Sequence, residues 1–239
     1  MDARQGASDP VTLYALYAGV AVPILYFGTQ LIAAPFYPGY SFLTNDASTL
    51  GSSGSAAPAV FNGGAIATGV AMLVGSWGFI RTFQKLGVHL VLTWLTMLTI
   101  ISGAIGSINA GMHPLPDPRH ASGLLSTLGS GILFLPLLLP VAVWRIEALH
   151  NLRRYLVWNL VVVFCLIPIM IGLVQRLSLM AGVQIPGLSS LVNEYQGVLQ
   201  RIAALVVFGP IGVSAAFLVR LGRGSPKRTL PSPSTARVG

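Results

Sequence analysis

The chain has 239 residues, of which 54% are hydrophobic and only 8% are charged, whereas soluble domains carry about 25% charged residues. So few charges cannot cover a water-facing surface, and the composition therefore excludes a soluble globular protein and predicts an integral membrane protein. The formal net charge of +8 does not indicate a nucleic-acid partner, because the basic residues lie at the ends of apolar runs and in the C-terminal tail, not on a basic helix with interleaved aromatic side chains.

Six apolar stretches are long enough to cross a hydrocarbon core of about 30 Å. The first begins at Pro10 with Asp9 as its expected N-cap, and it lacks the features of a cleaved signal, so we expect it to remain as a membrane helix. The predicted spans are residues 11–36, 58–83, 88–111, 120–144, 154–181 and 198–221. They predict an all-α, polytopic membrane protein with six transmembrane helices in one bundle. A short N-terminus (1–10) and a basic, disordered tail (222–239) flank the transmembrane domain (11–221).

Lysine and arginine are distributed unevenly about these spans. Eleven of them lie at the N-terminus, in the loops after the second and fourth spans and near the C-terminus, whereas three, Arg119, Arg176 and Arg201, lie on the other side. Because cytoplasmic loops carry the excess of basic residues, we expect both termini in the cytoplasm. The loops after the first, third and fifth spans then face outward.

Small residues recur at four-residue spacing in the third and fourth spans, which predicts close packing of these helices in lipid. They are Ser102, Gly106 and Ala110, followed by Ser122, Ser126 and Ser130. The single cysteine, Cys165, lies inside an apolar run, so a disulfide within the chain is excluded.

The outward loops and the adjacent helix ends gather most of the polar side chains. Asn62, Asn109 and Arg201 fall at the edge of the hydrocarbon region, where a polar group is costly unless it faces a partner or a cavity. This placement predicts an outward-facing polar pocket. Its candidate ligand-binding residues are Asn45, Asp46, Ser48, Asn62, Asn109, Asp117, Arg119, His120, Glu194, Gln200 and Arg201.

Two reactive chemistries fit this set. His113 and His120, with one of the three carboxylates, would suit Zn²⁺ with an open position, although their spacing is not that of a helical metal motif. Alternatively, His120 and Asp46 act as general acid and base on a lipid headgroup, with Ser48 or Ser122 as the nucleophile. No nucleophile motif accompanies them, and the sequence identifies no cofactor.

Two other interpretations need no reaction. In one, Arg119, Arg201 and the asparagines hold an anionic or polar headgroup, since arginine forms paired hydrogen bonds to phosphate and carboxylate. In the other, the polar residues only cap helices and pair with one another. Asp46 would then bind Arg201, and Asp117 would cap the fourth helix.

Three segments, YPGYSFLTNDASTLGSSGSAAPAVFN, GMHPLPD and EYQGVLQR, resemble the bacterial and archaeal six-helix membrane proteins of domain-of-unknown-function family nine-nine-eight, which is grouped loosely with the eukaryotic Frag/DRAM type. The resemblance spans about residues 11–221. It implies the six-helix fold and a bacterial cytoplasmic membrane, but no activity. Family members often carry an aromatic residue in place of His113, which favours His120 as the functional histidine. The family-like positions are Asn45, Ser48, Leu50, Gly51, Asn62, His113, Asp117, His120 and Arg201.

We therefore expect a membrane protein whose outward-facing pocket binds a lipid headgroup or another amphiphile. A membrane enzyme that acts on lipid in that pocket, with or without a metal, is the first alternative. An accessory subunit of a larger membrane complex is the second, in which the small-residue seams and apolar faces contact a protein partner. Membrane lipids are the expected partners in the first two cases.

Overall fold

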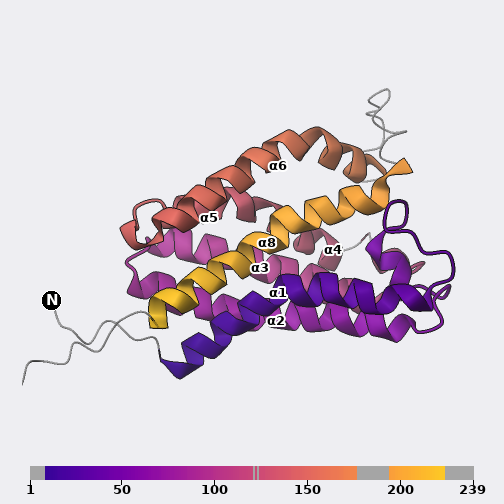
Figure 1. The fold of residues 1–239 in the computed structure, drawn as a ribbon, viewed down its shortest axis with the longest axis horizontal. Coiled ribbons are helices and arrows are strands. Elements are labelled where there is room, and N and C mark those ends of the chain that lie inside the picture. Colours follow the sequence, from indigo (N-terminus) through magenta and orange to yellow (C-terminus); the bar gives the residue numbers. More distant parts are fainter. Residues whose placement is uncertain (1–8, 121, 123, 177–193, 224–239) are drawn as a thin grey trace, which may run out of the picture.

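The computed structural model describes residues 9–120, 122, 124–176 and 194–223, with residues 167–176 described by their backbone alone. Helices form the regular structure of this part (Figure 1). The long helices are α1 (Pro10–Ala33), α2 (Pro58–Lys85), α3 (Leu90–Met112), α6 (His150–Arg176) and α8 (Gln196–Arg223). The shorter helices are α4 (Leu124–Gly129) and α5 (Leu135–Val143), with the 3₁₀ helices η2 (Ala34–Phe36), η3 (Ala47–Gly51), η4 (Pro118–His120), η5 (Ser130–Phe134) and η6 (Glu147–Leu149).

Five segments among the described residues are long and apolar enough to cross a membrane, which confirms a polytopic integral membrane protein. They are Pro10–Phe36, Pro58–Lys85, Leu90–Met112, Pro118–Val143 and Gln196–Arg223. α6 corresponds to the fifth predicted span and continues for 27 residues. The end of that prediction, 177–181, lies outside the described residues, as do 1–8 and 224–239.

The start of α1 is fixed by the predicted N-cap. The Asp9 carboxylate accepts hydrogen bonds from the main-chain N–H and the hydroxyl of Thr12, at 2.9 and 2.7 Å. These bonds, together with Lys85 at 3.5 Å, lower the pKa of Asp9 to about 2. The Lys85 contact also joins the start of α1 to the end of α2, so these two ends lie on the same side of the bundle.

The fourth predicted span, 120–144, corresponds to the candidate span Pro118–Val143, but it is not one regular α-helix. The chain crosses this region as α4, η5 and α5 in succession. Gly129 is a weak helix former, and the Ser130 hydroxyl donates to the Thr127 carbonyl at 2.6 Å, which offers the backbone an alternative to helical bonding. Pro136 and Pro140 then supply no N–H for helical hydrogen bonds. The segment therefore takes 3₁₀ geometry over Ser130–Phe134, while its backbone stays helical through Gly129, Phe134 and Leu135.

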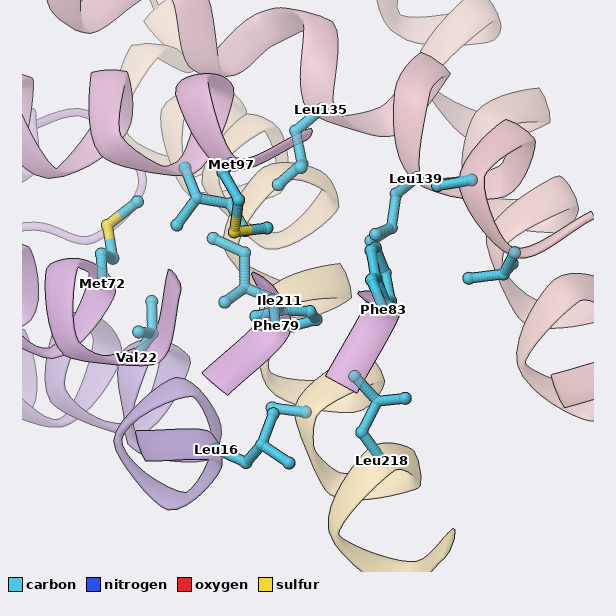
Figure 2. Packing of buried hydrophobic residues seen from close by; sticks show 14 of the residues in the cluster. Leu16, Val22, Met72, Phe79, Phe83, Met97, Leu135, Leu139, Ile211 and Leu218 are labelled. Carbon is cyan, nitrogen blue, oxygen red and sulfur yellow. The ribbon is translucent and has the colours of Figure 1, made fainter. Parts of the chain in front are cut away.

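One apolar core joins the helices (Figure 2). Its centre is formed by side chains that are fully buried, namely Leu16 and Val22 of α1, Met72, Phe79 and Phe83 of α2, Met97 of α3, Leu135 and Leu139 of α5, and Ile211 and Leu218 of α8. The rings of Phe79 and Phe83 meet edge to face with centroids 5.8 Å apart. Packing against this core fixes which face each helix turns outward.

Small residues let the helices approach closely, as the sequence pattern predicts for the third and fourth spans. A Cβ atom on Gly129 of α4 would lie 2.5 Å from the Cα of Gly106 on α3. The Ser102 hydroxyl of α3 donates to the Leu128 carbonyl beside this crossing. A similar approach between Gly19 and Gly75 joins α1 to α2. These seams hold the bundle together where lipid gives no hydrophobic driving force.

The helices run back and forth, so alternate connections gather at opposite ends (Figure 1). The start of α1, the turn between α5 and α6 and the end of α8 lie at one end, on the left of Figure 1. We call it the basic end, since basic residues lie at the helix ends that meet there, namely Lys85 at the end of α2, Arg153 and Arg154 near the start of α6, and Arg220 and Arg223 in the last turn of α8. The loop 37–57, the turn after α3 and the start of α8 lie at the other end, which we call the loop end.

Candidate functional site

Arg201, near the start of α8, joins that helix to the loop 37–57. Its guanidinium donates to the carbonyls of Phe42, Asn45 and Gly197, at 3.0, 3.1 and 2.7 Å, and to the hydroxyl of Tyr40. It also lies over the Phe42 ring, 4.8 Å from the centroid. Burial raises the pKa of Tyr40 despite the nearby guanidinium. We call this set of contacts the Arg201 clasp, and its partners are the protein's own carbonyls and hydroxyl.

The clasp extends over the first two turns of α8. The Gln200 side chain accepts a hydrogen bond from the main-chain N–H of Ala47 at 2.7 Å. A Cβ atom on Gly197 would lie 2.5 Å from the carbonyl oxygen of Asn45 and 2.7 Å from that of Phe42. Glycine is therefore required at position 197, because the loop backbone lies directly against the helix.

The remaining candidates near this end of the chain lie in the loop 37–57 or on the part of α2 that contacts it. Asn45 accepts, through its side chain, a hydrogen bond from a main-chain N–H four residues earlier, at 2.8 Å. Asp46 stands immediately before η3, and Ser48 lies within η3 and is half-buried. The Asn62 amide of α2 donates to the Gly51 carbonyl at 3.1 Å and so holds the end of η3 against α2.

A second group of contacts, the Asp117 turn, lies between α3 and α4. Arg119 donates to the Asp117 carboxylate through Nη2 at 2.7 Å and Nε at 3.0 Å, and its main-chain N–H donates at 2.9 Å. These bonds, with a smaller contribution from His113 at 3.4 Å, hold the pKa of Asp117 well below its usual range. Asp117 therefore caps the short helix η4, whereas the sequence suggests that it caps the fourth long helix. The Arg119 side chain remains 68% exposed.

Asn109 and His120 fix this turn to α3. Asn109 is only 3% exposed, and its amide donates to the Arg119 carbonyl at 2.9 Å. His120 Nδ1 lies 2.9 Å from the His113 carbonyl oxygen. Because a carbonyl only accepts, Nδ1 carries the proton, and Nε2 of the neutral ring is an acceptor. The described residues contain no group of three or more His, Cys, Asp or Glu side chains placed to hold a metal ion.

The two groups of contacts are neighbours at the loop end. A Cβ atom on Gly111 of α3 would lie 2.5 Å from the Asn62 carbonyl oxygen of α2, so Asn62 and Asn109 lie on adjoining helices. Glu194 lies just before α8, is exposed, and raises the pKa of Tyr195 through a hydrogen bond. The sequence therefore predicted correctly which residues share this end of the bundle, although it did not predict their partners.

An apolar groove next to the Asp117 turn was not predicted. Its volume is about 550 Å³, and it lies between α3 and the α4–η5–α5 segment. Leu95, Leu98, Ser102 and Ile105 of α3 line one side, and Leu128, Gly131, Phe134 and Leu137 line the other. We call it the α3–α5 groove. Its loop-end limit, at Ile105, is one helical turn from Asn109, which binds the Asp117 turn.

Comparison with known proteins gives one match. The sequence model of a family described as "Protein of unknown function (DUF998)" matches residues 20–216. A search of curated proteins and a search of solved structures each found no significant match.

Proposed function

The chain belongs to the DUF998 family of proteins of unknown function, and we propose that it binds a membrane lipid at the loop end. One acyl chain occupies the α3–α5 groove, and the headgroup contacts the Asp117 turn. In this proposal α6 also crosses the membrane, which brings the number of transmembrane helices to six. Both termini lie in the cytoplasm, and the loop end faces outward from a bacterial cytoplasmic membrane. The ligand is an amphiphile, bound by an apolar and a polar surface that adjoin.

The observation that carries the proposal is an apolar groove whose limit at Ile105 lies one helical turn from Asn109, which binds the polar Asp117 turn. Its volume of about 550 Å³ lies within the range of about 300–1,000 Å³ found for ligand pockets. The leucines that line it are partly exposed on the membrane-facing surface, and Leu98 keeps 55% of its area exposed. An acyl chain can therefore enter sideways from the bilayer, without crossing the core.

The headgroup contacts follow from the hydrogen bonds of Arg119. Its bonds to Asp117 use Nε and Nη2, so Nη1 of this exposed side chain is directed to no partner among the described residues. A phosphate oxygen can bind at Nη1, and Asp117 can attract an ammonium group. A zwitterionic phospholipid fits this pair of charges. Arg201 supports the site indirectly, because its own donors bind the loop 37–57.

The proposal can be tested by counting lipids retained after purification. Native mass spectrometry of the full chain in mild detergent should show at least one bound phospholipid, one of which depends on the groove. Leu98→Trp, which fills the groove from an exposed position, should lower the retained fraction at least tenfold, and Arg119→Gln should lower it severalfold. Leu31→Trp, at an exposed position of α1, is the matched control and should change nothing. Equal retention in the Leu98→Trp and Leu31→Trp variants would refute the proposal.

A membrane enzyme is a second candidate, supported by the orientation of His120. The His113 carbonyl fixes the proton on Nδ1 and leaves Nε2 as an acceptor, which is the arrangement of a general base. Incubation of the reconstituted protein with phospholipid, followed by analysis of released headgroups and fatty acids, tests this candidate. Activity that disappears in His120→Gln while bound lipid is retained would favour the enzyme, and unaltered lipid would exclude hydrolysis of that substrate.

A further inference from the structure

A second pocket lies at the basic end, across the bundle from the proposed lipid site. Its volume is about 520 Å³, and it is lined by Trp144, His150, Arg153, Arg154, Val157 and Trp158. We propose that this basic pocket binds the phosphate headgroup of an anionic phospholipid from the adjacent leaflet. The inference is independent of the function proposed for the loop end, since the two sites share no residue.

The pocket is built on one face of α6. Residues 150, 153, 154, 157 and 158 follow the i, i+3, i+4, i+7, i+8 spacing of a single helical face. The buried side chains Leu149, Leu152 and Leu156 anchor the same region in the core, each at most 1% exposed. This face is therefore held outward by the packing of the bundle, and the pocket does not depend on a flexible loop.

Arg153 holds one wall of the pocket in place. Its Nη1 donates to the Trp144 carbonyl at 2.5 Å, and its guanidinium carbon lies 5.4 Å from the centroid of the Trp144 ring. The contact joins the end of α5 to the second turn of α6. The guanidinium therefore has a defined position beside the pocket, with donors that remain for a ligand.

The positive charge of the pocket favours an anionic ligand. Arg153 and Arg154 lie within the first five residues of α6, where the helix dipole is already positive, and no acidic residue occupies the first turn. Neither arginine has a carboxylate within 4.0 Å in the part of the chain that the structure describes, and this includes Glu147 on the preceding turn. A phosphate in the pocket would neutralise this concentration of positive charge.

The aromatic rings indicate that the anion belongs to a lipid. Trp144 and Trp158 are 55% and 67% exposed, and tryptophan prefers the headgroup level of a bilayer, where its ring contacts acyl chains and its N–H contacts water. Val161 and Phe164 continue the exposed apolar surface of α6 away from the pocket. A headgroup among the arginines would thus leave its acyl chains along α6, which is the arrangement expected of a basic interfacial lipid site.

The test compares two lipids and one soluble anion on the purified full chain. Native mass spectrometry should show phosphatidylglycerol binding at least tenfold more tightly than phosphatidylcholine with the same acyl chains. Arg154→Gln should remove most of this preference, Arg154→Lys should keep most of it, and Trp158→Leu should weaken binding of both lipids. Arg81→Gln is the matched control, because Arg81 also lies over a tryptophan, Trp77, at 5.9 Å but outside the pocket. Inorganic phosphate at the same concentration should not displace the lipid.

Three results would overturn the inference. If Arg154→Gln and Arg81→Gln lowered the preference for phosphatidylglycerol equally, general surface charge would be what attracts the lipid. Equal affinity for the two lipids would mean that the pocket does not recognise the headgroup charge. Displacement by inorganic phosphate at equal concentration would make the pocket a site for soluble anions. Arg154 is exposed and makes no hydrogen bond among the described residues, so its variants should fold, and thermal unfolding checks this.

Discussion

Arg201 stabilises the fold, because its guanidinium binds groups of the protein itself. It binds three carbonyls, a hydroxyl and two aromatic rings, and these contacts attach the loop 37–57 to α8. We predict that Arg201→Gln destabilises the protein by about 1–3 kcal/mol, because it leaves the part-buried carbonyls of Asn45 and Gly197 without a charged donor. Arg201→Lys should recover little, since an ammonium group lacks the planar fork of donors.

Thermal unfolding in one detergent measures this effect, with Arg119→Gln as the control. Arg119 is exposed and paired with Asp117, so its loss should lower the melting temperature far less than the loss of Arg201 does. If the two variants had equal melting temperatures, the Arg201 clasp would not be a stabilising contact.

The N-cap of α1 makes a pH-dependent contribution. Hydrogen bonds from Thr12, together with Lys85, lower the pKa of Asp9 from 3.8 to about 2. A lowered pKa means that the ionised form stabilises the fold above about pH 4, and that this contribution is lost as the pH falls toward 2. The protection factor of the Thr12 amide, which is its exchange rate relative to that of an unstructured amide at the same pH, should therefore stay constant down to about pH 4 and fall below it. In Asp9→Asn this protection factor should not change over the interval, and a parallel fall there would exclude titration of Asp9 as the cause.

The crossing of α3 and α4 depends on two glycines. A Cβ atom on Gly129 would lie 2.5 Å from the backbone of Gly106, whereas one on Gly63 of α2 would meet nothing within 4 Å. We predict that Gly129→Ala destabilises the protein by about 1–3 kcal/mol through overpacking. Gly63→Ala should be neutral or stabilising by up to about 1 kcal/mol, because alanine is the better helix former. Thermal unfolding of the two variants provides the comparison, and an equal response would mean that the helices can separate at no cost.

Most helices could be predicted from hydropathy, because a span in lipid must satisfy its backbone internally and be long enough to cross. The predicted spans 58–83 and 198–221 correspond to α2 (Pro58–Lys85) and α8 (Gln196–Arg223) within a few residues. The 3₁₀ segment inside the fourth span could not be predicted from hydropathy, since the mean hydropathy of 118–143 is high with or without it. Besides the local effect of Gly129 and the prolines, the close approach of Gly129 to Gly106 of α3 is a tertiary contact that the sequence does not specify.

In the candidate site, too, the location of the residues could be predicted, but their contacts could not. The topology predicted that Asn62, Asn109 and Arg201 would lie at one end, and the structure places them there. The partners of Arg201 could not be predicted, because they are main-chain carbonyls that any sequence supplies. The α3–α5 groove was missed for a related reason, since it lies between two segments and its shape depends on how they pack.

At the scale of the whole molecule, the orientation in the membrane can be tested with the loops at the two ends. Cys165 is the single cysteine, so a Cys165→Ala background permits site-specific labelling. In intact cells, a membrane-impermeant maleimide should label Thr44→Cys, in the loop after α1, and should reach Gln84→Cys, near the end of α2, only after lysis. Both positions are exposed. The reverse pattern would invert the proposed topology and place the basic end outside.

The most direct test of the proposed function is photo-crosslinking in a bilayer with a phospholipid that carries a diazirine on its acyl chain. If the α3–α5 groove binds one acyl chain, peptides that contain residues 95–105 and 128–138 should be labelled several times more than the exposed surface of α1 around Leu31. Leu98→Trp should remove this excess. Equal labelling of α1 and the groove, unchanged by Leu98→Trp, would contradict lipid binding in the groove.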